Sequence, residues 1–270
     1  PTKNQPKRYL KAQSVLSKKN FKQMIRETID RCKNGVNRIS LPRLFLILGL
    51  TISLEPSYGQ SLNFNGVRFD AVNVKASTVR LGGEEVLRVE RDLQALPLDP
   101  GDMISTVDEP TFLKLSDTDF SDGTIEVKLL SRLLPEAPPF ARGFIGVAFR
   151  IGDDNSVFES IYLRPTNGRA EDQQRRNHTV QYFSYPGYKF AELRKPEYGG
   201  QYETYADIGL NEWITMRIEV VGSQAKLYLN DQPYPSFVVN SMLGKPIHGA
   251  VGLWVEVGTE GYFKDIKVSK

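Results

Sequence analysis

Cysteine is almost absent from this chain of 270 residues, which contains a single one, Cys32. Residues 60–270 have none, so disulfides and thiol chemistry are excluded from this part of the chain. Histidine is nearly as scarce, with only His178 and His248. The H-E-x-x-H, G-x-S-x-G and P-loop patterns are also missing, so nothing in the sequence indicates a zinc protease, a serine hydrolase of that type or a P-loop nucleotide site.

Long hydrophobic runs are missing as well, apart from the 11 residues LFLILGLTISL at 44–54. This run is too short to span a bilayer comfortably. Basic residues precede it, and the small-x-small pattern Ser57-Tyr58-Gly59 follows it, as in a secretion signal. We therefore expect residues 1–59 to be an N-terminal extension and signal, with cleavage after Gly59, and residues 60–270 to form one secreted or periplasmic domain. The alternative is an uncleaved membrane anchor. The chain begins with Pro1, and Met24 is a plausible start.

Positive charge is concentrated in the leader. Residues 1–59 hold 12 Lys and Arg against 3 Asp and Glu, a net charge of +9, whereas residues 60–270 hold 23 against 29, a net charge of −6. The body is therefore mildly acidic and lacks the basic surface that nucleic-acid binding requires. We expect no nucleic-acid partner, and contact with a membrane only through an uncleaved signal.

Helical periodicity is not evident after residue 60, where short Val-, Ile-, Phe- and Tyr-rich runs alternate with Gly, Asp, Asn and Pro. The expected strands are 67–74, 86–89, 111–115, 124–130, 144–151, 157–164, 178–183, 213–220, 226–230, 249–257 and 263–268. Many short strands without helices between them predict an all-β sandwich or barrel. Alternation places Trp254 and Glu256 on the non-core face of one strand, and Arg150 with Gly146 and Ala148 on the non-core face of another.

Four segments together resemble a known family. They are DGTIEVKLL (122–130), GFIGVAFRI (143–151), EWITMRIEVVGSQAKLYLND (212–231) and GAVGLWVEVGTEGYFKDIKV (249–268). In this order they look like a concanavalin-A-like jelly roll of the laminin-G-like kind, and more narrowly like the 3-keto-disaccharide hydrolase-like domains of bacterial secreted proteins. The resemblance covers about residues 65–268. It implies a β-sandwich of two antiparallel sheets, with ligands on a concave face or at its rim.

The segment 158–182 is the richest in groups suited to binding or catalysis. Arginine forks bind carboxylates and sugar hydroxyls through paired donors, and tyrosine rings can stack on sugar faces. The predicted ligand-binding residues are Tyr162, Arg164, Asn167, Arg169, Arg175, Arg176, Asn177, Gln181, Tyr182 and Tyr185, with Trp254 and Glu256 as a second platform. The alternative is that the arginines pair with Glu171, Asp172 and Glu159 and stiffen the loop, that some of the rings fasten the long loop to the sandwich, and that Trp254 packs beneath a loop.

Three residues are candidates for proton transfer. They are Glu159, Asp172 and His178. Glu159 alternates with Ile161 and Leu163, so it is expected to be buried and either protonated or paired with an arginine. His178 has the ordinary pKa range for proton transfer near neutral pH, although it could simply bond a loop carbonyl. The E-x-D-x-x-E strand of glucanases with this fold is missing, which argues against ordinary retaining glycosidase chemistry.

No resident cofactor or catalytic metal is expected. Asp117, Asp119 and Asp122 suggest a calcium site, but the glutamate that closes an EF-hand loop is missing. We therefore interpret this segment as a turn, with a structural calcium ion as the alternative. The leading hypothesis is a carbohydrate-binding domain that engages a glycan, an acidic one in view of the arginines. A glycoside hydrolase or lyase acting on 3-keto or acidic oligosaccharides, and an envelope adhesion domain that binds protein, are the alternatives.

Overall fold

The computed structural model describes residues 60–99, 101–245 and 248–270. The predicted leader, 1–59, lies outside the described residues. Within the described ranges, no helix is long and apolar enough to cross a membrane.

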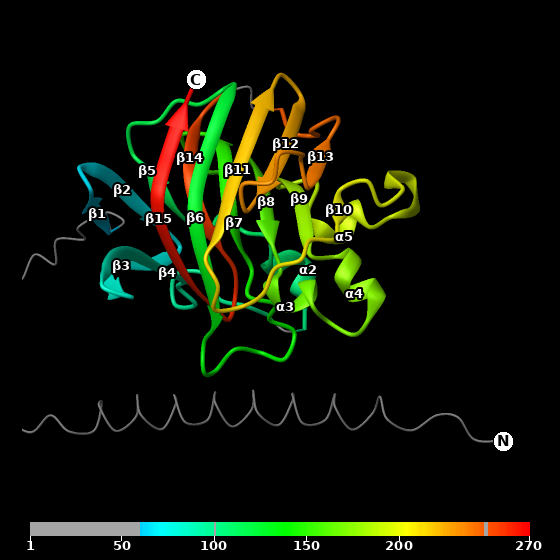
Figure 1. Ribbon diagram of the computed structural model, residues 1–270, viewed down its shortest axis with the longest axis horizontal. Coiled ribbons are helices and arrows are strands. Elements are labelled where there is room, and N and C mark those ends of the chain that lie inside the picture. Colours follow the sequence, from blue (N-terminus) through cyan, green and yellow to red (C-terminus); the bar gives the residue numbers. More distant parts are fainter. Residues whose placement is uncertain (1–59, 100, 246–247) are drawn as a thin grey trace, which may run out of the picture. The chain divides into compact units, whose positions relative to one another are not determined.

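Two antiparallel sheets form the domain (Figure 1). The eight-stranded sheet has the order β1 (Ser61–Phe64), β2 (Val67–Val72), β5 (Phe112–Leu115), β14 (Ala250–Val255), β7 (Ile145–Ile151), β8 (Phe158–Leu163), β9 (Val180–Tyr185) and β10 (Glu203–Thr204). The seven-stranded sheet has the order β13 (Phe237–Val239), β12 (Gln224–Leu229), β11 (Ile214–Val221), β6 (Gly123–Leu133), β15 (Thr259–Ser269), β4 (Glu84–Arg91) and β3 (Val74–Leu81). The predicted fold class, an all-β jelly-roll sandwich of two antiparallel sheets, is confirmed.

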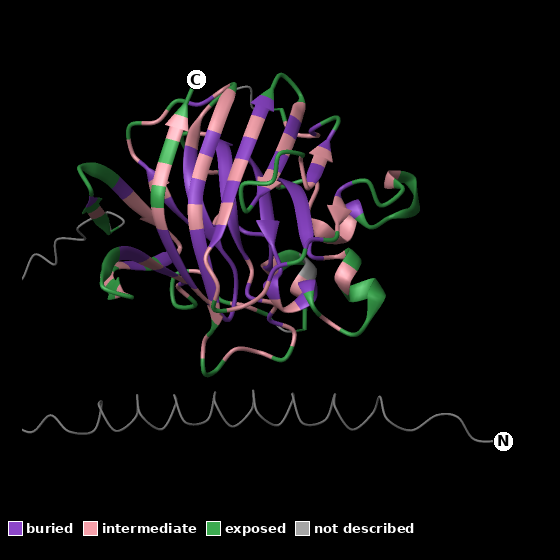
Figure 2. Cartoon of the chain, viewed as in Figure 1, coloured by how far each residue is buried: buried purple, intermediate pink, exposed green. Residues whose placement is uncertain are grey.

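The outer faces of the two sheets differ in their exposure to solvent (Figure 2). In β11 and β12 buried residues alternate with half-exposed ones, as expected for a sheet with one face in the core and the other in water. In β7 and β8 every residue is buried. The outer face of the eight-stranded sheet must therefore be covered by other parts of the chain.

Short helices lie within the covering segments. They are α2 (Met103–Thr106), α3 (Pro165–Gly168), α4 (Gln173–Asn177), α5 (Phe190–Leu193) and the 3-10 helix η1 (Pro196–Tyr198). Figure 1 shows α3, α4 and α5 beside β9 and β10, and their residues lie between the strands expected from the sequence. None is longer than 5 residues, which is consistent with the lack of helical periodicity.

Two departures from strict alternation correct the predicted strands. The expected strand 67–74 is divided at Asn73, whose φ of 53° starts β3 in the other sheet. Arg150 has a φ of 52° within a bulge, where Phe149 and Arg150 together lie opposite Val251. The side chain of Arg150 consequently does not share the face of Gly146 and Ala148, and it donates to the carbonyls of Ser121 and Gly222 instead.

Candidate functional site

The register of the strands fixes which side chains reach the outer face of the eight-stranded sheet. Ile145 and Val255 point at Gly261 of the opposite sheet, so they mark the inner face. Tyr162 pairs with Gly146, which also pairs with Trp254, and these residues alternate with the inner ones. Tyr162 and Trp254 therefore lie on the outer face, and their rings are 4.8 Å apart.

A cavity of about 250 Å³ lies over this part of the outer face. Its floor and nearest wall come from the ends of strands, and its other walls come from the loop 133–144, the segment 165–178, and the segments that contain α2 and α5. It is lined by Met103, Val107, Asp108, Phe140, Arg142, Phe144, Tyr162, Arg164, Asn167, Arg175, His178, Phe190, Arg194 and Glu256.

Arg164 is the centre of the polar wall. It follows β8 directly and is only 4% exposed, so its guanidinium must be fully bonded. Nη2 donates to the Tyr162 hydroxyl at 2.6 Å and to Gln181 Oε1 at 3.1 Å, and Nη1 donates to the His178 carbonyl at 3.0 Å and to Glu203 Oε1 at 3.1 Å. The guanidinium also lies 4.8 Å from the centre of the Tyr162 ring. Arg164 thus has one fixed orientation.

Glu203, on β10, is shared by two guanidinium groups and lies close to the imidazole of His178. It accepts from Arg164 and, at 2.6 Å, from Arg194, and its Oε2 lies 2.5 Å from His178 Nδ1. Burial acts to raise the pKa of Glu203, but the hydrogen bond from Arg194 and the surrounding positive charges lower it overall. Glu203 therefore stays ionised near neutral pH.

His178 is held close to Glu203 without the alignment of a hydrogen bond, since its Nδ1 has no hydrogen-bond partner in the described residues. Burial lowers the pKa of His178, and the attraction of Glu203 only partly opposes this effect. The imidazole is therefore mainly neutral at pH 7 and can accept or donate a proton at the cavity wall.

Asp108 is a cavity residue that the sequence analysis missed. It is 3% exposed and has a left-handed backbone, with a φ of 54°, a conformation that Asp and Asn tolerate better than most residues. Its Oδ2 accepts from the backbone N–H of Phe190 at 2.8 Å, and burial raises the pKa of its carboxyl group. The only signal in the sequence is an acidic pair, Asp108-Glu109, before Pro110 in a loop, which does not distinguish it from an ordinary turn.

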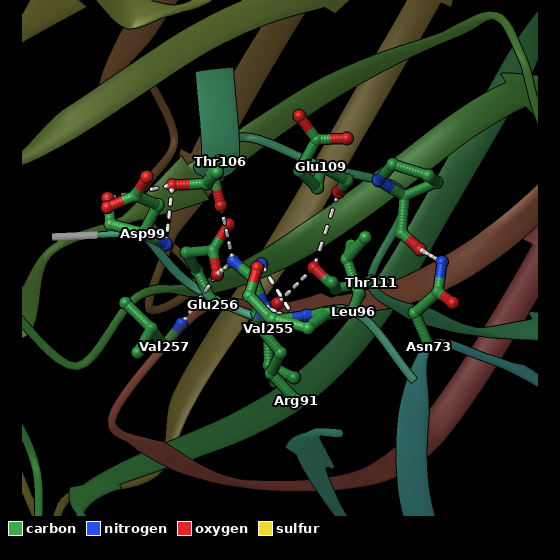
Figure 3. A network of polar contacts seen from close by, with 12 residues as sticks. Asn73, Arg91, Leu96, Asp99, Thr106, Glu109, Thr111, Val255, Glu256 and Val257 are labelled. Atoms are coloured by element: carbon green, nitrogen blue, oxygen red, sulfur yellow. Dashed lines mark hydrogen bonds and ion pairs between the residues drawn. The ribbon is translucent and has the colours of Figure 1, made fainter. Parts of the chain in front are cut away.

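The far end of the cavity is closed by a buried ion pair (Figure 3). Arg91, at the end of β4, donates to Glu256, which follows β14, and the two side chains are 1% and 2% exposed. Arg91 also donates to the carbonyls of Leu96 and Thr106 and so fastens the segment that contains α2. The second carboxylate oxygen of Glu256 is buried without a protein partner in the described residues. Arg91 therefore links both sheets to the covering segment.

The structure brings about half of the predicted site residues to one place. Tyr162, Arg164, Asn167, Arg175, His178 and Glu256 all line the cavity. Gln181 lies directly behind Arg164, at 3.1 Å. The cavity also contains residues that were not predicted, namely Asp108, Arg142, Phe144, Phe190 and Arg194 among others.

Three predicted ligand-binding residues lie outside the cavity on the surface. Arg169 pairs with Asp207 at 2.7 Å and with Glu212 at 3.0 Å, so it is ion-paired, but not with Glu171, Asp172 or Glu159, which the alternative named. Arg176 donates to the Tyr205 hydroxyl, and Asn177 accepts from Gln173. These contacts belong to the exposed side of α4 and the chain beside it, so the three side chains do not reach the cavity.

Glu159 and Tyr182 lie on the opposite, inner face of the sheet. Alternation along β8 and β9 separates them from Tyr162 and Gln181, so they cannot share the cavity. Glu159 is fully buried and accepts from the Tyr182 hydroxyl at 2.5 Å. Asp172 is also displaced, because it is the exposed N-cap of α4, where its side chain accepts from the Arg175 N–H. Of the three candidates for proton transfer, the structure therefore brings only His178 to the cavity.

Trp254 and Tyr185 do not form an open platform. Trp254 is 0% exposed, and its Nε1 donates to the Glu109 carbonyl at 2.9 Å. Tyr185 donates its hydroxyl to the Glu109 side chain at 3.0 Å. The segment before β5 covers both rings, which is the alternative that the sequence left open for Trp254.

The aspartates considered for calcium have other contacts. Asp119 lies 2.8 Å from His248 Nδ1, and Asp122 accepts from the N–H of Gly222. Among residues 60–99, 101–245 and 248–270, no group of three or more His, Cys, Asp or Glu is arranged to hold a metal ion.

Comparison with known proteins adds little at the level of sequence, since no protein-family model matches the chain and no curated protein matches it significantly. Among solved structures, it is similar to the carbohydrate-binding module CBM66 from Bacillus subtilis, with 14% identity, 74% of this chain and 97% of that chain covered, and a TM-score of 0.46. It is also similar to a Bacillus licheniformis beta-glucanase, with 11% identity, 78% and 91% covered, and a TM-score of 0.40. A third is the Caenorhabditis elegans galectin LEC-6, with 12% identity, 57% and 91% covered, and a TM-score of 0.33.

Proposed function

We propose that residues 60–270 are a carbohydrate-binding domain and that the glycan binds in the cavity over Tyr162 and Arg164. The observation that carries this proposal is the make-up of the cavity wall. Phe140, Phe144 and Phe190 supply apolar surface, while Asp108 and Asn167 supply groups that bond hydroxyls. A sugar requires this combination, because its C–H faces pack on apolar rings and its hydroxyls need directed partners.

The size of the cavity supports a small ligand unit. Its volume of about 250 Å³ is below the roughly 300–1,000 Å³ that holds a drug-sized molecule. One sugar ring, with part of a second at the opening, is the unit that we expect it to hold. The polar wall is fixed in advance by the bonds of Arg164 and Glu203, which reduces the ordering cost of binding.

Calorimetric titration with a panel of oligosaccharides tests the proposal. Phe144→Ala removes an apolar wall without touching the ion pairs, and we expect at least tenfold weaker binding of any glycan that the wild type binds. Arg176→Ala is the control on α4, next to the cavity residue Arg175 but outside the cavity, and we expect its affinity to be unchanged. Equal affinities for the wild type and Phe144→Ala contradict the assignment of the site.

Export is the second part of this proposal. The basic segment, the apolar run 44–54 and the small residues at Ser57 and Gly59 support removal of residues 1–59 and a secreted or periplasmic location. Mass spectrometry of the exported protein is expected to find a chain of about 211 residues that begins at Gln60. Retention of the leader in a membrane fraction contradicts it.

A glycoside hydrolase or lyase is the second candidate, because two buried carboxyl groups, Asp108 and Glu256, line the same cavity. Most glycoside hydrolases use two carboxyl groups to cleave a glycosidic bond. Burial raises the pKa of both groups, and Arg91 opposes this for Glu256. Release of new reducing ends from a bound oligosaccharide, abolished in Asp108→Asn, supports an enzyme. Binding without turnover supports a binding domain.

A further inference from the structure

The four arginines of the cavity fall into two pairs that differ in their partners. Arg164 and Arg194 share the carboxylate of Glu203. The guanidinium groups of Arg142 and Arg175 have no carboxylate within 4 Å in the described part of the chain, although both residues line the same cavity. The positive charge on one side of the cavity is therefore partly offset by Glu203, whereas the guanidinium groups on the other side have no carboxylate partner in the described residues.

Arg142 is held by backbone carbonyls alone. Its Nη1 donates to the carbonyls of Pro139 at 2.9 Å and of Ala141 at 2.8 Å, while its Nε and Nη2 make no protein hydrogen bond in the ranges described. Burial lowers the pKa of the Arg142 guanidinium, and the positive charges of Arg175 and Arg164 lower it further. Arg142 thus has unused donors and lies close enough to Arg175 to be repelled by it.

Arg175 lines the cavity from α4. It lies in the last turn of α4, where its Nε donates to Asn167 Oδ1 at 3.2 Å and its Nη2 donates to the Thr166 carbonyl at 3.3 Å. These neutral acceptors orient the guanidinium but leave its charge uncompensated. A second positive charge without a carboxylate partner in the described residues is therefore held at the cavity that Arg142 lines.

Two like charges that line one cavity repel each other, and an anion between them removes the repulsion. The planar donor forks of arginine bind carboxylate and sulfate groups through paired hydrogen bonds. The cavity has room for about one sugar ring, so that anion must belong to the sugar itself or lie next to its ring.

We propose that the cavity takes an acidic sugar residue whose anionic group lies between Arg142 and Arg175, with the ring against Phe144 and its hydroxyls near Asp108. This inference rests on the proposed carbohydrate-binding function and names its ligand class. The anionic group is a carboxylate, as in a uronic acid, or a sulfate ester.

The test is calorimetric titration of the protein with three matched probes. They are a galacturonic acid trisaccharide, its carboxyl-reduced neutral counterpart, and a galactose trisaccharide carrying sulfate esters. We expect the wild type to bind one of the two acidic probes at least tenfold more tightly than the neutral probe, and the preferred one identifies the carboxylate or the sulfate as the natural group. We also expect this preference to weaken as salt is added, because it is electrostatic.

Matched variants locate the preference. Arg142→Gln and Arg175→Gln each remove one uncompensated charge, and we expect either to weaken acidic binding at least tenfold while changing neutral binding less than threefold. Arg169→Gln removes the same charge from the neighbouring surface, and we expect the preference to be retained. Circular dichroism melting of each variant verifies that it is folded.

Three results overturn the inference, and they are distinguishable. Equal affinity for acidic and neutral probes refutes the acidic ligand and leaves carbohydrate binding intact. No binding of any probe by the folded wild type refutes both. An acidic preference that survives in the folded double variant Arg142→Gln/Arg175→Gln also overturns it, because the anion must then be bound elsewhere.

Discussion

Polar side chains in and next to β8 and β9 are buried on both faces of the eight-stranded sheet, but the number and charge of their partners differ between the faces. On the outer face, Arg164 has four protein partners, one of them an ionised carboxylate, and it borders a cavity. On the inner face, Glu159 accepts a single hydrogen bond from Tyr182, and its second oxygen has no partner in the described residues. Burial raises the pKa of Glu159 to about 7. The network of Arg164 and Glu203 on the outer face thus keeps its charges, whereas burial favours the neutral form of Glu159 on the inner face.

The largest effect on the free energy of unfolding is expected at the buried ion pair of Arg91 and Glu256. Arg91→Met removes one partner of an ion pair whose side chains are 1% and 2% exposed, which leaves Glu256 as an uncompensated buried charge. Such a change costs about 3–5 kcal/mol of the free energy of unfolding. Urea denaturation measures it. The double variant Arg91→Met/Glu256→Met is expected to recover most of the loss, and a loss below about 1 kcal/mol in the single variant contradicts this account of the pair.

The next effect concerns pH and the inner face. The pKa of Glu159 rises from its ordinary 4.5 to about 7 in the folded chain, so the folded state binds this proton more tightly than the unfolded state does. Its contribution to stability is therefore complete below pH 4.5 and is lost as the pH rises toward 7, by about 3 kcal/mol at most. Glu159→Gln should remove this pH dependence and be the more stable protein at pH 8.

Denaturation of both proteins at pH 4.5, 6 and 8 checks this prediction. The difference between the stabilities of the variant and the wild type should grow with pH. A constant difference means that Glu159 is ionised in the folded state and that the contrast between the two faces is wrong. Glycan binding should be unchanged in this variant, because Glu159 does not reach the cavity.

A smaller effect is expected at Gly244, which packs on Glu159. A Cβ atom there would come within 2.1 Å of Glu159 Oε1 and 2.7 Å of Ser184 Oγ. Gly244→Ala forces these side chains to move and should cost about 1–3 kcal/mol of the free energy of unfolding, measured by denaturation, without weakening glycan binding. A loss of binding in the folded variant would show that the inner face contributes to the site.

The smallest effect is expected on the surface beside the cavity. Arg169 pairs with Asp207 and Glu212, but the Arg169 and Asp207 side chains are 56% and 67% exposed. Exposed pairs of this kind contribute about 0–1 kcal/mol, so Arg169→Ala should change the free energy of unfolding by no more than that. A change above about 2 kcal/mol would mean that this pair, and not only the cavity network, organises the loop.

The strand alternation could be predicted from sequence, and with it the pairing of Tyr162 with Arg164 on one face and the burial of Glu159 on the other. The period of 2 fails at Arg150, where a bulge intervenes, and at Asn73, where the chain passes to the other sheet. The positions of Asp108, Arg142 and Phe190 could not be predicted, because they lie in segments without a repeating pattern.

Trp254 shows the same limit of prediction from the sequence. Its face was predicted correctly, but its exposure depends on the segment before β5 that crosses over it and accepts its N–H at Glu109. Periodicity assigns a side chain to a face of a sheet. It does not state which distant loop covers that face, because such contacts depend on the path of the whole chain.

A crystal structure of the protein soaked with the galacturonic acid trisaccharide tests the central claim most directly. The account predicts one sugar ring against Phe144 with its carboxylate between Arg142 and Arg175, above Tyr162. A trisaccharide bound only elsewhere, for example in the hollow lined by Asp122, Arg150 and Lys245, would contradict it.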